Sequence, residues 1–300
     1  MGLQMTPGAR RRSSSLLACI IVSIVFLVSL VFSSRVIGVD KVIAYWLTGL
    51  SLSLVGLLAY YRGLEFLVSG SIHNSFLAAT LGYIFALIFG VNIYYSAIPV
   101  GLMLTYLAGY LIHRGIDPNK VSSFMVSFSS SMGVLLAYYV LTMFPAQYSL
   151  SSIMLGDPVL MSRQDVLVTT VISIIVVTVV ILIYNKIILL SIDPVSARIA
   201  GVRIGYYDFI TYTLIGLATI GLLRISGYIM EHVMILLPAI VGARISRSSK
   251  EHLLLTLLVS TTSTMLGYVA AVNYGLSPVG VSGFILVIAF LYVALTGWGR

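Results

Sequence analysis

The sequence predicts an all-α polytopic membrane protein with about ten transmembrane helices and with both chain ends in the cytoplasm. Three observations predict this fold class: the composition, the long apolar runs, and the distribution of Lys and Arg. Of the 300 residues, 59% are hydrophobic and only 9% are charged, whereas a soluble domain carries about 25% charged residues. So few charged side chains cannot cover a water-facing surface, and the chain is therefore expected to lie in lipid.

The pattern within the apolar runs distinguishes helices from barrel strands. Strands of a membrane barrel read as segments of about ten residues in which apolar and polar positions alternate. Runs such as 166–184 and 284–295 show no such alternation. The sequence therefore predicts a bundle of helices and excludes a β-barrel.

Each candidate span is an apolar stretch of about 20 residues, the length that crosses a bilayer as a helix. The first candidate follows a basic segment, 1–15. It is too long for the apolar region of a signal peptide and lacks a convincing small-residue cleavage site, so we expect it to remain as a helix. The ten candidates are 16–34, 42–61, 73–90, 92–112, 121–144, 166–189, 207–223, 226–243, 253–272 and 279–297.

The Lys and Arg residues then fix the expected orientation, because cytoplasmic loops carry an excess of both. With the N-terminus inside, thirteen of them fall on the inner side and four on the outer side. The inner set is Arg10, Arg11, Arg12, Arg62, Arg114, Lys120, Lys186, Arg198, Arg203, Arg244, Arg247, Lys250 and Arg300. The outer set is Arg35, Lys41, Arg163 and Arg224. This asymmetry predicts an N-in, C-in topology.

The net charge of +8 does not indicate a nucleic-acid partner, because the basic residues stand at the ends of apolar runs, where membrane topology places them. The single cysteine, Cys19, excludes an internal disulfide and a cysteine metal site.

Few ionisable residues fall within the predicted spans, where each is costly and needs a reason. Glu231 and His232 are adjacent in the eighth span, and His73 begins the third. Carboxylate and imidazole groups suit a divalent cation such as zinc, manganese or iron. One interpretation is a transient metal site in a transport path formed by these three residues. The other is structural, with Glu231 paired to Arg224 two helical turns earlier and the histidines bonded to neighbouring helices.

Two further polar features have simpler interpretations. His113 and His252 stand at inner helix ends, where solvated roles are expected. The fifth span is rich in serine, which favours close helix packing with hydrogen bonds between helices, although a hydrated path is an alternative. Its serines are Ser122, Ser123, Ser127, Ser129, Ser130 and Ser131.

The most informative segment, 193–205, lies between two spans on the inner face. Asp193 can cap a short helix, Pro194 suits its first position, and Gly201 can end it in a left-handed conformation. Ala197 and Gly201 would place small residues on one face of this helix. We expect the helix to dock a cytoplasmic partner.

No motif for nucleotide hydrolysis or for other catalysis occurs in the sequence. A G-x-x-x-x-G-K-[ST] phosphate loop, a G-x-S-x-G elbow and an H-E-x-x-H helix are all missing. The chain is therefore not expected to be an enzyme.

Several motifs, in a preserved order from about residue 42 to the end, resemble the permease subunits of metal-ion ABC importers of the zinc/manganese/iron family. The strongest is the D-x3-A-x3-G pattern at Asp193, Ala197 and Gly201, followed by a helix and the stretch 227–244 with Leu236-Leu237-Pro238-Ala239. The others are Ser69 to His73, Leu155 to Ser162, and Leu276 to Gly280.

The resemblance implies a homodimer of a type II ABC importer permease, joined by two cytoplasmic ATPase subunits and an extracytoplasmic solute-binding protein. The segment from Asp193 to Gly205 would couple the chain to the ATPases. The cargo would be a divalent metal ion moved by alternating access, with no permanently bound cofactor. The family pattern Asp-x3-His lines the metal path, but Ser69 replaces its Asp here. Either Glu231 and His232 supply the lost ligand, or the cargo is not a bare ion.

The resemblance also implies a single permease domain over 1–300, with a family-like core at 42–297 and an extra N-terminal helix at 16–34. The expected location is the prokaryotic cytoplasmic membrane, among lipid. The extra helix makes permeases for iron-siderophore or cobalamin chelates the first alternative. A stand-alone secondary transporter is the second, although no internal repeat supports it.

Overall fold

The computed structural model describes residues 24–25, 38–144 and 155–296, with the side chain of Ile229 excluded. The predicted basic segment 1–15 and nearly all of the first predicted span, 16–34, lie outside these residues. The described chain consists of helices and connecting segments, and no strand occurs in it. The helices are α2 (Val39–Arg62), α3 (Glu65–Phe89), α4 (Ile93–His113), α5 (Pro118–Met143), α7 (Arg163–Ile192), α8 (Pro194–Ile199), α9 (Ile204–Gly221), α10 (Leu223–Ser226), α11 (Tyr228–Ile245), α12 (Ser249–Tyr274) and α13 (Pro278–Thr296).

The predicted spans from residue 42 onward each overlap one of the long helices. Seven of the described helices are long and apolar enough to cross a membrane: α2, α3, α4, α5, α7, α12 and α13. The all-helical membrane fold is therefore confirmed.

Caps at the helix ends explain where most of these helices begin. Asp117 caps α5 by accepting hydrogen bonds from two backbone N–H groups, with Pro118 at the first helical position, as predicted. Ser162 and Asp165 form a reciprocal capping box at the start of α7. Ser277 accepts a hydrogen bond from the N–H of Gly280 at the start of α13. These local signals are readable from the sequence because each depends on residues within one turn.

The predicted start of the third span, at residue 73, is wrong. Helix α3 begins at Glu65, so His73 lies more than two turns inside it. The apolar pattern weakens over 69–75, but two of the polar side chains there are hydrogen-bonded within the bundle. The Ser75 hydroxyl donates to the carbonyl of Ile72, and Asn74 accepts a hydrogen bond from Ser129 of α5. The helix therefore continues where hydropathy alone suggests a boundary.

The helical structure between α9 and α11 is interrupted at two points, with a single helical turn between them. Leu222 ends α9, α10 follows as a single turn, and Gly227 opens α11 with φ +70°. The break is buried, and the segment before α7 covers it. A Cβ on Gly156 would lie 2.5 Å from the backbone nitrogen of Gly227, so glycine is needed at this crossing.

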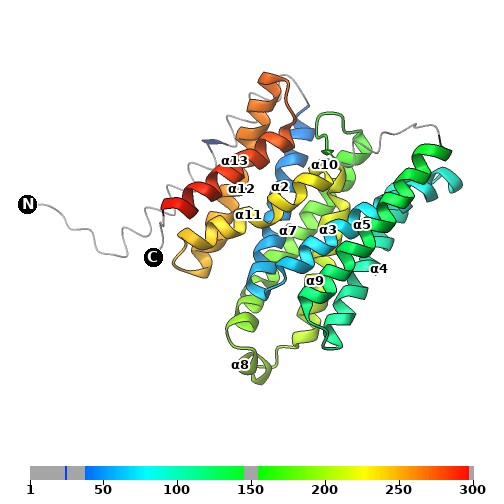
Figure 1. Ribbon diagram of the computed structural model, residues 1–300. Helices are drawn as coiled ribbons and strands as arrows, with labels where there is room; N and C mark the ends of the chain where they lie inside the picture. The colour runs from blue at the N-terminus through cyan, green and yellow to red at the C-terminus, as the bar shows by residue number, and fades with distance from the viewer. Residues whose placement is uncertain (1–23, 26–37, 145–154, 297–300) are drawn as a thin grey trace, which may run out of the picture.

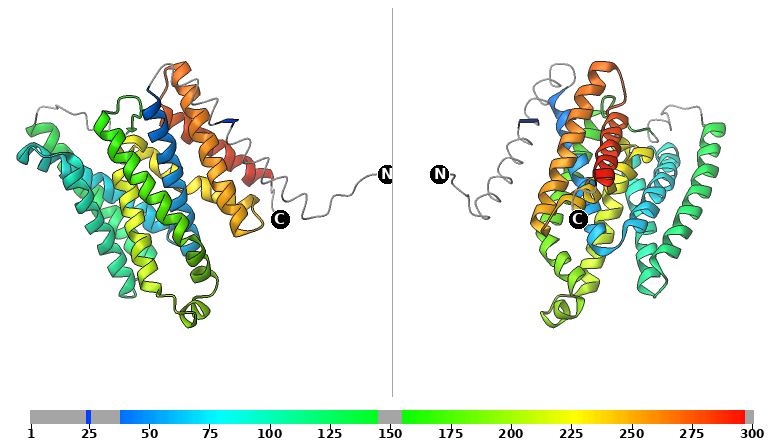
Figure 2. Two further views of the ribbon diagram at one scale, coloured as in Figure 1. Left: turned by 180° about the vertical axis from the view of Figure 1, so that it is seen from behind. Right: turned by 60° about the vertical axis from the view of Figure 1, so that its left-hand side comes forward.

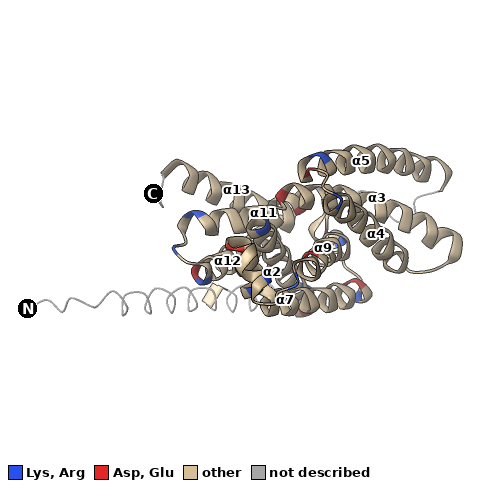
Figure 3. Ribbon diagram, turned by 90° about the horizontal axis from the view of Figure 1, so that it is seen from below, with Lys and Arg blue, Asp and Glu red and all other residues tan. Residues whose placement is uncertain are grey.

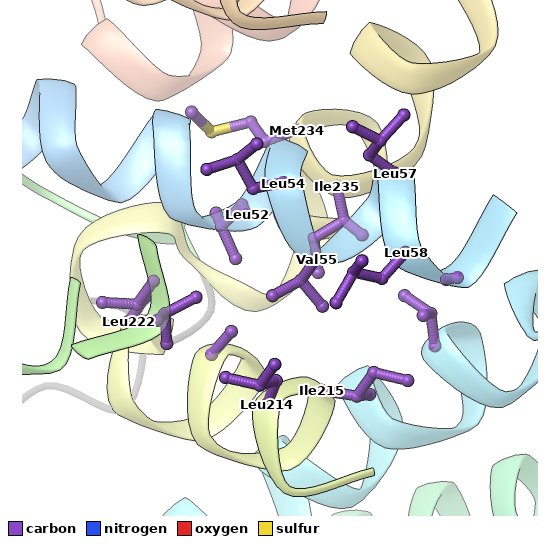
Figure 4. Packing of buried hydrophobic residues seen from close by; sticks show 14 of the residues in the cluster. Leu52, Leu54, Val55, Leu57, Leu58, Leu214, Ile215, Leu222, Met234 and Ile235 are labelled. Carbon is purple, nitrogen blue, oxygen red and sulfur yellow. The ribbon is translucent and has the colours of Figure 1, made fainter. Parts of the chain in front are cut away.

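Helix α2 is the centre of the bundle and packs against α7, α9, α11 and α12 (Figure 1). In the left-hand view of Figure 2, α4 and α5 lie on one side of α2 and α7, and α12 and α13 lie on the other. Figure 4 shows the leucines of α2 meeting Leu214 and Ile215 of α9 and Met234 and Ile235 of α11. Among the glycines within α2, Gly56 lies closest to a neighbouring helix, because a Cβ there would be 1.9 Å from the backbone oxygen of Ile235.

The connections divide between the two ends of the bundle. Helix α8 and the α4–α5 turn lie at one end, whereas the segment before α7 and the α12–α13 turn lie at the other (Figure 1). Figure 3 shows that Lys, Arg, Asp and Glu occupy few positions along the helices. Charge in the described chain is therefore available mainly where helices end.

Candidate functional site

Two of the three predicted site residues meet between α3 and α11. The ring centroids of His73 and His232 are 5.5 Å apart, with the ring planes at 73°. Both side chains are partly buried. His73 lies eight residues into α3, which is about 12 Å along the helix axis. Two imidazoles are thus placed side by side well inside the apolar part of the bundle.

Two hydroxyl groups complete this cluster. The hydroxyl oxygens of Tyr228 and Ser130 lie 2.7 Å and 2.8 Å from Nδ1 of His73. The ring of His232 lies beside that of Tyr228, one turn earlier in α11, with the centroids 6.1 Å apart. We call His73, Ser130, Tyr228 and His232 the histidine cluster. It joins α3, α5 and α11.

Glu231, the third predicted residue, does not join the histidine cluster. Its side chain is fully buried, and its Oε1 atom lies 3.4 Å from the Ser226 hydroxyl, which donates a hydrogen bond to it. Its Oε2 atom has no hydrogen-bond partner in the described chain. Among the described residues, no group of three or more His, Cys, Asp or Glu side chains is placed to hold a metal ion. The three residues therefore do not form one ligand set within a protomer.

The structural alternative for Glu231, a pair with Arg224, is wrong. Arg224 instead contacts Asp165, with Nη1 and Oδ1 3.3 Å apart. Tyr94 donates a hydrogen bond of 3.1 Å to the same oxygen, and the Ser162 hydroxyl donates to the other oxygen. The prediction failed because it assumed one continuous helix from residue 224 to 231, whereas Gly227 breaks it. This network ties α4, α7 and α10 together at the end of the bundle that carries the segment before α7.

The two remaining histidines have different environments. His113 is exposed, in agreement with a solvated role. The same expectation for His252 is wrong, because its side chain is 2% exposed. Its Nε2 atom lies 2.8 Å from the carbonyl oxygen of Ala239 and its Nδ1 atom 3.0 Å from the Tyr61 hydroxyl. Its place in the first turn of α12 suggested water, but α2 and α11 cover it.

Helix α8 has the caps that the sequence predicts. The carboxylate of Asp193 accepts hydrogen bonds from the backbone N–H groups of Val195 and Ser196. Hydrogen bonds with Ser196 and Val195 lower the pKa of this exposed carboxyl. At the other end, Gly201 has φ +80°. The N–H of Val202 donates to the carbonyl of Ala197, which completes a Schellman motif.

The predicted docking face of α8 requires a correction. Ala197 is fully buried against the rest of the chain, because its side chain faces the bundle. It therefore anchors α8 and does not share an open face with Gly201. The open surface carries Val195 and Ile199, which are 67% and 83% exposed, and a Cβ on Gly201 would meet nothing within 4 Å.

The serines of α5 separate into two groups. Ser129 donates a hydrogen bond to Asn74 of α3, which fits the predicted role in helix packing. Ser123, Ser127 and Ser131 are spaced one turn apart and are exposed. We call these three residues the serine stripe.

The sequence reasoning missed Tyr228 as a member of the cluster. A tyrosine three residues before Glu231 carries no signal on its own, because aromatic residues are common in spans. Its position after Gly227 was the available sign, since a glycine that opens a helix redirects the first side chain.

Comparisons with known proteins agree with this geometry. The sequence model of the ABC 3 transport family matches residues 37–297. The chain belongs to the ABC 3 transport family. This membership makes it an integral membrane protein and a transport subunit, not an enzyme. The expected family is therefore confirmed over most of the chain.

One curated relative and two solved structures illustrate the similarity. The chain is 25% identical over 221 residues to the manganese import system permease protein ScaB of Streptococcus parasanguinis, which covers 73% of this chain and 76% of the relative. PsaBC from Streptococcus pneumoniae, in complex with Fab, superposes with a TM-score of 0.74 and 17% identity over 89% of this chain and 95% of that one. An inward-facing conformation of a putative metal-chelate type ABC transporter superposes with a TM-score of 0.75 and 16% identity, over 95% of this chain and 99% of that one. The two structures establish the fold.

Proposed function

We propose that this chain is the membrane permease subunit of an ATP-binding-cassette importer that carries a divalent metal ion across the cytoplasmic membrane of a prokaryote. Membership of the ABC 3 transport family supports this proposal, as does the similarity to ScaB, a manganese import system permease protein. The observation that carries it is the pairing of His73 with His232 inside the membrane-spanning bundle. Ionisable side chains in such a position mark ion pathways.

The proposed path passes the histidine cluster as the importer alternates between outward-open and inward-open states. Imidazole nitrogen suits zinc, iron, copper and nickel, whereas carboxylate oxygen suits manganese. With Ser69 in place of the family Asp and Glu231 apart from the cluster, His73 and His232 are the nearest candidate ligands of a transported ion. No permanently bound cofactor is part of this proposal.

A metal chelate, such as an iron-siderophore or cobalamin-type cargo, is the second candidate. The observation in its favour is the alignment of the chain over 95% of its length with a putative metal-chelate type transporter. Loss of the acidic ligand at Ser69 also fits a cargo that brings its own ligands.

The proposed assembly is a homodimer with two cytoplasmic ATPase subunits and an extracytoplasmic solute-binding protein. We propose one permease domain over 1–300, with ten spans, both ends in the cytoplasm, and 16–34 as the additional helix. The charge asymmetry of the loops supports this orientation. Helix α8, with Val195 and Ile199 open on its surface, is the proposed ATPase contact.

Substitution in the path tests the transport role. Replacing His73 with Ala, or Glu231 and His232 together with Ala, should abolish uptake of Mn²⁺ and Zn²⁺ into proteoliposomes while dimer assembly remains intact. His113→Ala is the matched control, because His113 is exposed. Full uptake by both site variants would refute the proposed path.

Substitution in α8 tests the ATPase contact. Gly201→Trp should uncouple ATP hydrolysis from uptake, because a bulky side chain on the open surface would separate the subunits. Gly115→Trp is the matched control: Gly115 also has positive φ and open space, in the α4–α5 turn. Both changes carry the same left-handed strain of about 1–2 kcal/mol. Equal coupling in the two variants would argue against docking at α8.

A further inference from the structure

Hydroxyl groups from two other helices lie beside a single nitrogen atom of His73, on α3. The hydroxyl of Tyr228, from α11, lies 2.7 Å from Nδ1, and the hydroxyl of Ser130, from α5, lies 2.8 Å from it. Both distances are within the range of good hydrogen bonds. No protein hydrogen bond to the other nitrogen, Nε2, occurs in the part of the chain that the structure describes. The two nitrogens of this ring are therefore treated differently by the fold.

The chemistry of the ring decides which nitrogen carries the proton. A neutral imidazole has one N–H and one lone pair, and a hydroxyl oxygen has two lone pairs. A proton on Nδ1 can be shared between two nearby oxygens in a three-centre bond, which is a common arrangement. A lone pair on Nδ1 would have to accept two O–H groups at once or face an oxygen lone pair. Two oxygens at this distance therefore favour the proton on Nδ1.

Tyr228 also contacts the second ring of the cluster. The ring centroids of Tyr228 and His232 are 6.1 Å apart, with the ring planes at 82°. Those of Tyr228 and His73 are 5.3 Å apart, at 81°. Tyr228 therefore packs against both imidazoles while its hydroxyl lies beside one of them. Histidines that ligate metals characteristically donate the N–H of the other nitrogen to an oxygen acceptor, which fixes the ring and its tautomer.

We propose that Tyr228 and Ser130 are positioning residues that orient His73 toward the transported cation. Their hydroxyl oxygens accept a hydrogen bond from the Nδ1–H group of His73, which leaves the Nε2 lone pair to bind a divalent ion. This inference rests on the proposed function and deepens it. Two oxygens share one proton, so each can partly replace the other. The structure therefore predicts that losing both hydroxyls is worse than the two single losses combined.

The tautomer can be measured directly. The chain has four histidines, so ¹⁵N-histidine labelling of the full chain in lipid gives few signals, and His73→Gln identifies the one that matters. We expect the shifts of a proton on Nδ1 in the wild type. In the double variant Tyr228→Phe, Ser130→Ala, that signature should weaken. A proton on Nε2 in the wild type would overturn the inference.

Cation binding gives a second, independent readout. Co²⁺ is the probe, because its visible absorption reports coordination by nitrogen. Relative to wild type, the double variant should bind Co²⁺ roughly 10-fold to 100-fold more weakly, the range for losing partners of a metal ligand, and each single variant about threefold more weakly. Ser130→Thr keeps a hydroxyl at this position, so this variant should bind Co²⁺ as tightly as wild type, unlike Ser130→Ala. Tyr106→Phe is the matched control, because it removes a hydroxyl bonded to Thr213 between α4 and α9.

The outcomes separate this inference from the proposed function. Unchanged Co²⁺ binding in the double variant, with binding lost in His73→Ala, would refute the positioning role and leave the transport site standing. Absence of both Co²⁺ binding and metal uptake in the wild type would refute the proposed function, and the inference with it. A Tyr106→Phe variant as weak as Tyr228→Phe would show a general packing defect and would also overturn the inference.

Discussion

Helices α2 and α5 are similar in length and both span the bundle, yet the protein covers them very differently. In the most apolar part of α2, 83% of the residues are buried, against 22% in α5. Helix α2 packs against neighbours on all sides, whereas α5 rests mainly on α3. Both helices contain serine, so composition alone does not separate them.

The difference lies in what their hydroxyl groups do. In α2, Thr48, Ser51 and Ser53 donate to carbonyls of their own helix and allow close packing. In α5, Ser129 and Ser130 reach α3, but the serine stripe stays open. A polar stripe is a poor lipid-facing surface. The comparison therefore shows that α2 uses its hydroxyl groups inside the bundle, whereas the serine stripe leaves hydroxyl groups on the surface of α5.

The largest expected effect follows from the close approach of α2 to α11. Gly56→Ala would place a Cβ 1.9 Å from the backbone oxygen of Ile235, and backbone cannot yield as a side chain can. We expect a loss of roughly 3 kcal/mol or more, since overpacking of a tight core commonly removes 1–3 kcal/mol. The midpoint of thermal unfolding in detergent measures it.

Gly70→Ala is the matched control, on the α3 face that meets α5. The nearest atom to a Cβ there is 3.5 Å away, in ordinary contact. In a helix, alanine is favoured over glycine by about 1 kcal/mol, so this variant should be as stable as wild type or slightly more. Equal destabilisation at both sites would contradict the contrast between the covered helix and the open one.

An intermediate effect is expected at the hydrogen bond between α3 and α5. Asn74→Ala leaves the buried Ser129 hydroxyl without its acceptor. The expected loss is about 0.6–1.7 kcal/mol, as for other hydrogen bonds between membrane helices. A double-mutant cycle with Ser129→Ala isolates the pair. A coupling energy near zero would mean that packing alone holds α5 in place.

The smallest effect on stability is expected in the serine stripe. Ser127→Leu changes an exposed position, so the free energy of unfolding should change by no more than about 0.5 kcal/mol. Uptake of Mn²⁺ and Zn²⁺ should nevertheless fall if the stripe meets a hydrated path. Leu135→Ser, at an exposed apolar position of the same helix, is the comparison. Undiminished uptake by Ser127→Leu would exclude a hydrated path at the serine stripe and would favour a contact between two copies of the chain there.

Local signals in the sequence predicted much of this protein. The apolar runs gave the helices, Asp117 and Asp193 gave caps, and Gly201 gave a left-handed end. These succeed because each depends on a few neighbouring residues or on the thickness of a bilayer. The start of α3 failed because hydropathy cannot register that Asn74 finds a partner in α5.

By itself, the sequence determined the helical membrane fold, the family motifs and the identity of the polar residues within the spans. Only the tertiary structure decided which of those residues meet. Glu231 and His232 are neighbours in the chain, yet they have different partners. Glu231 is buried beside Ser226, whereas His232 contacts His73 of α3. Adjacent helical positions point about 100° apart, so the packing around α11, and not proximity in sequence, selects the partner of each.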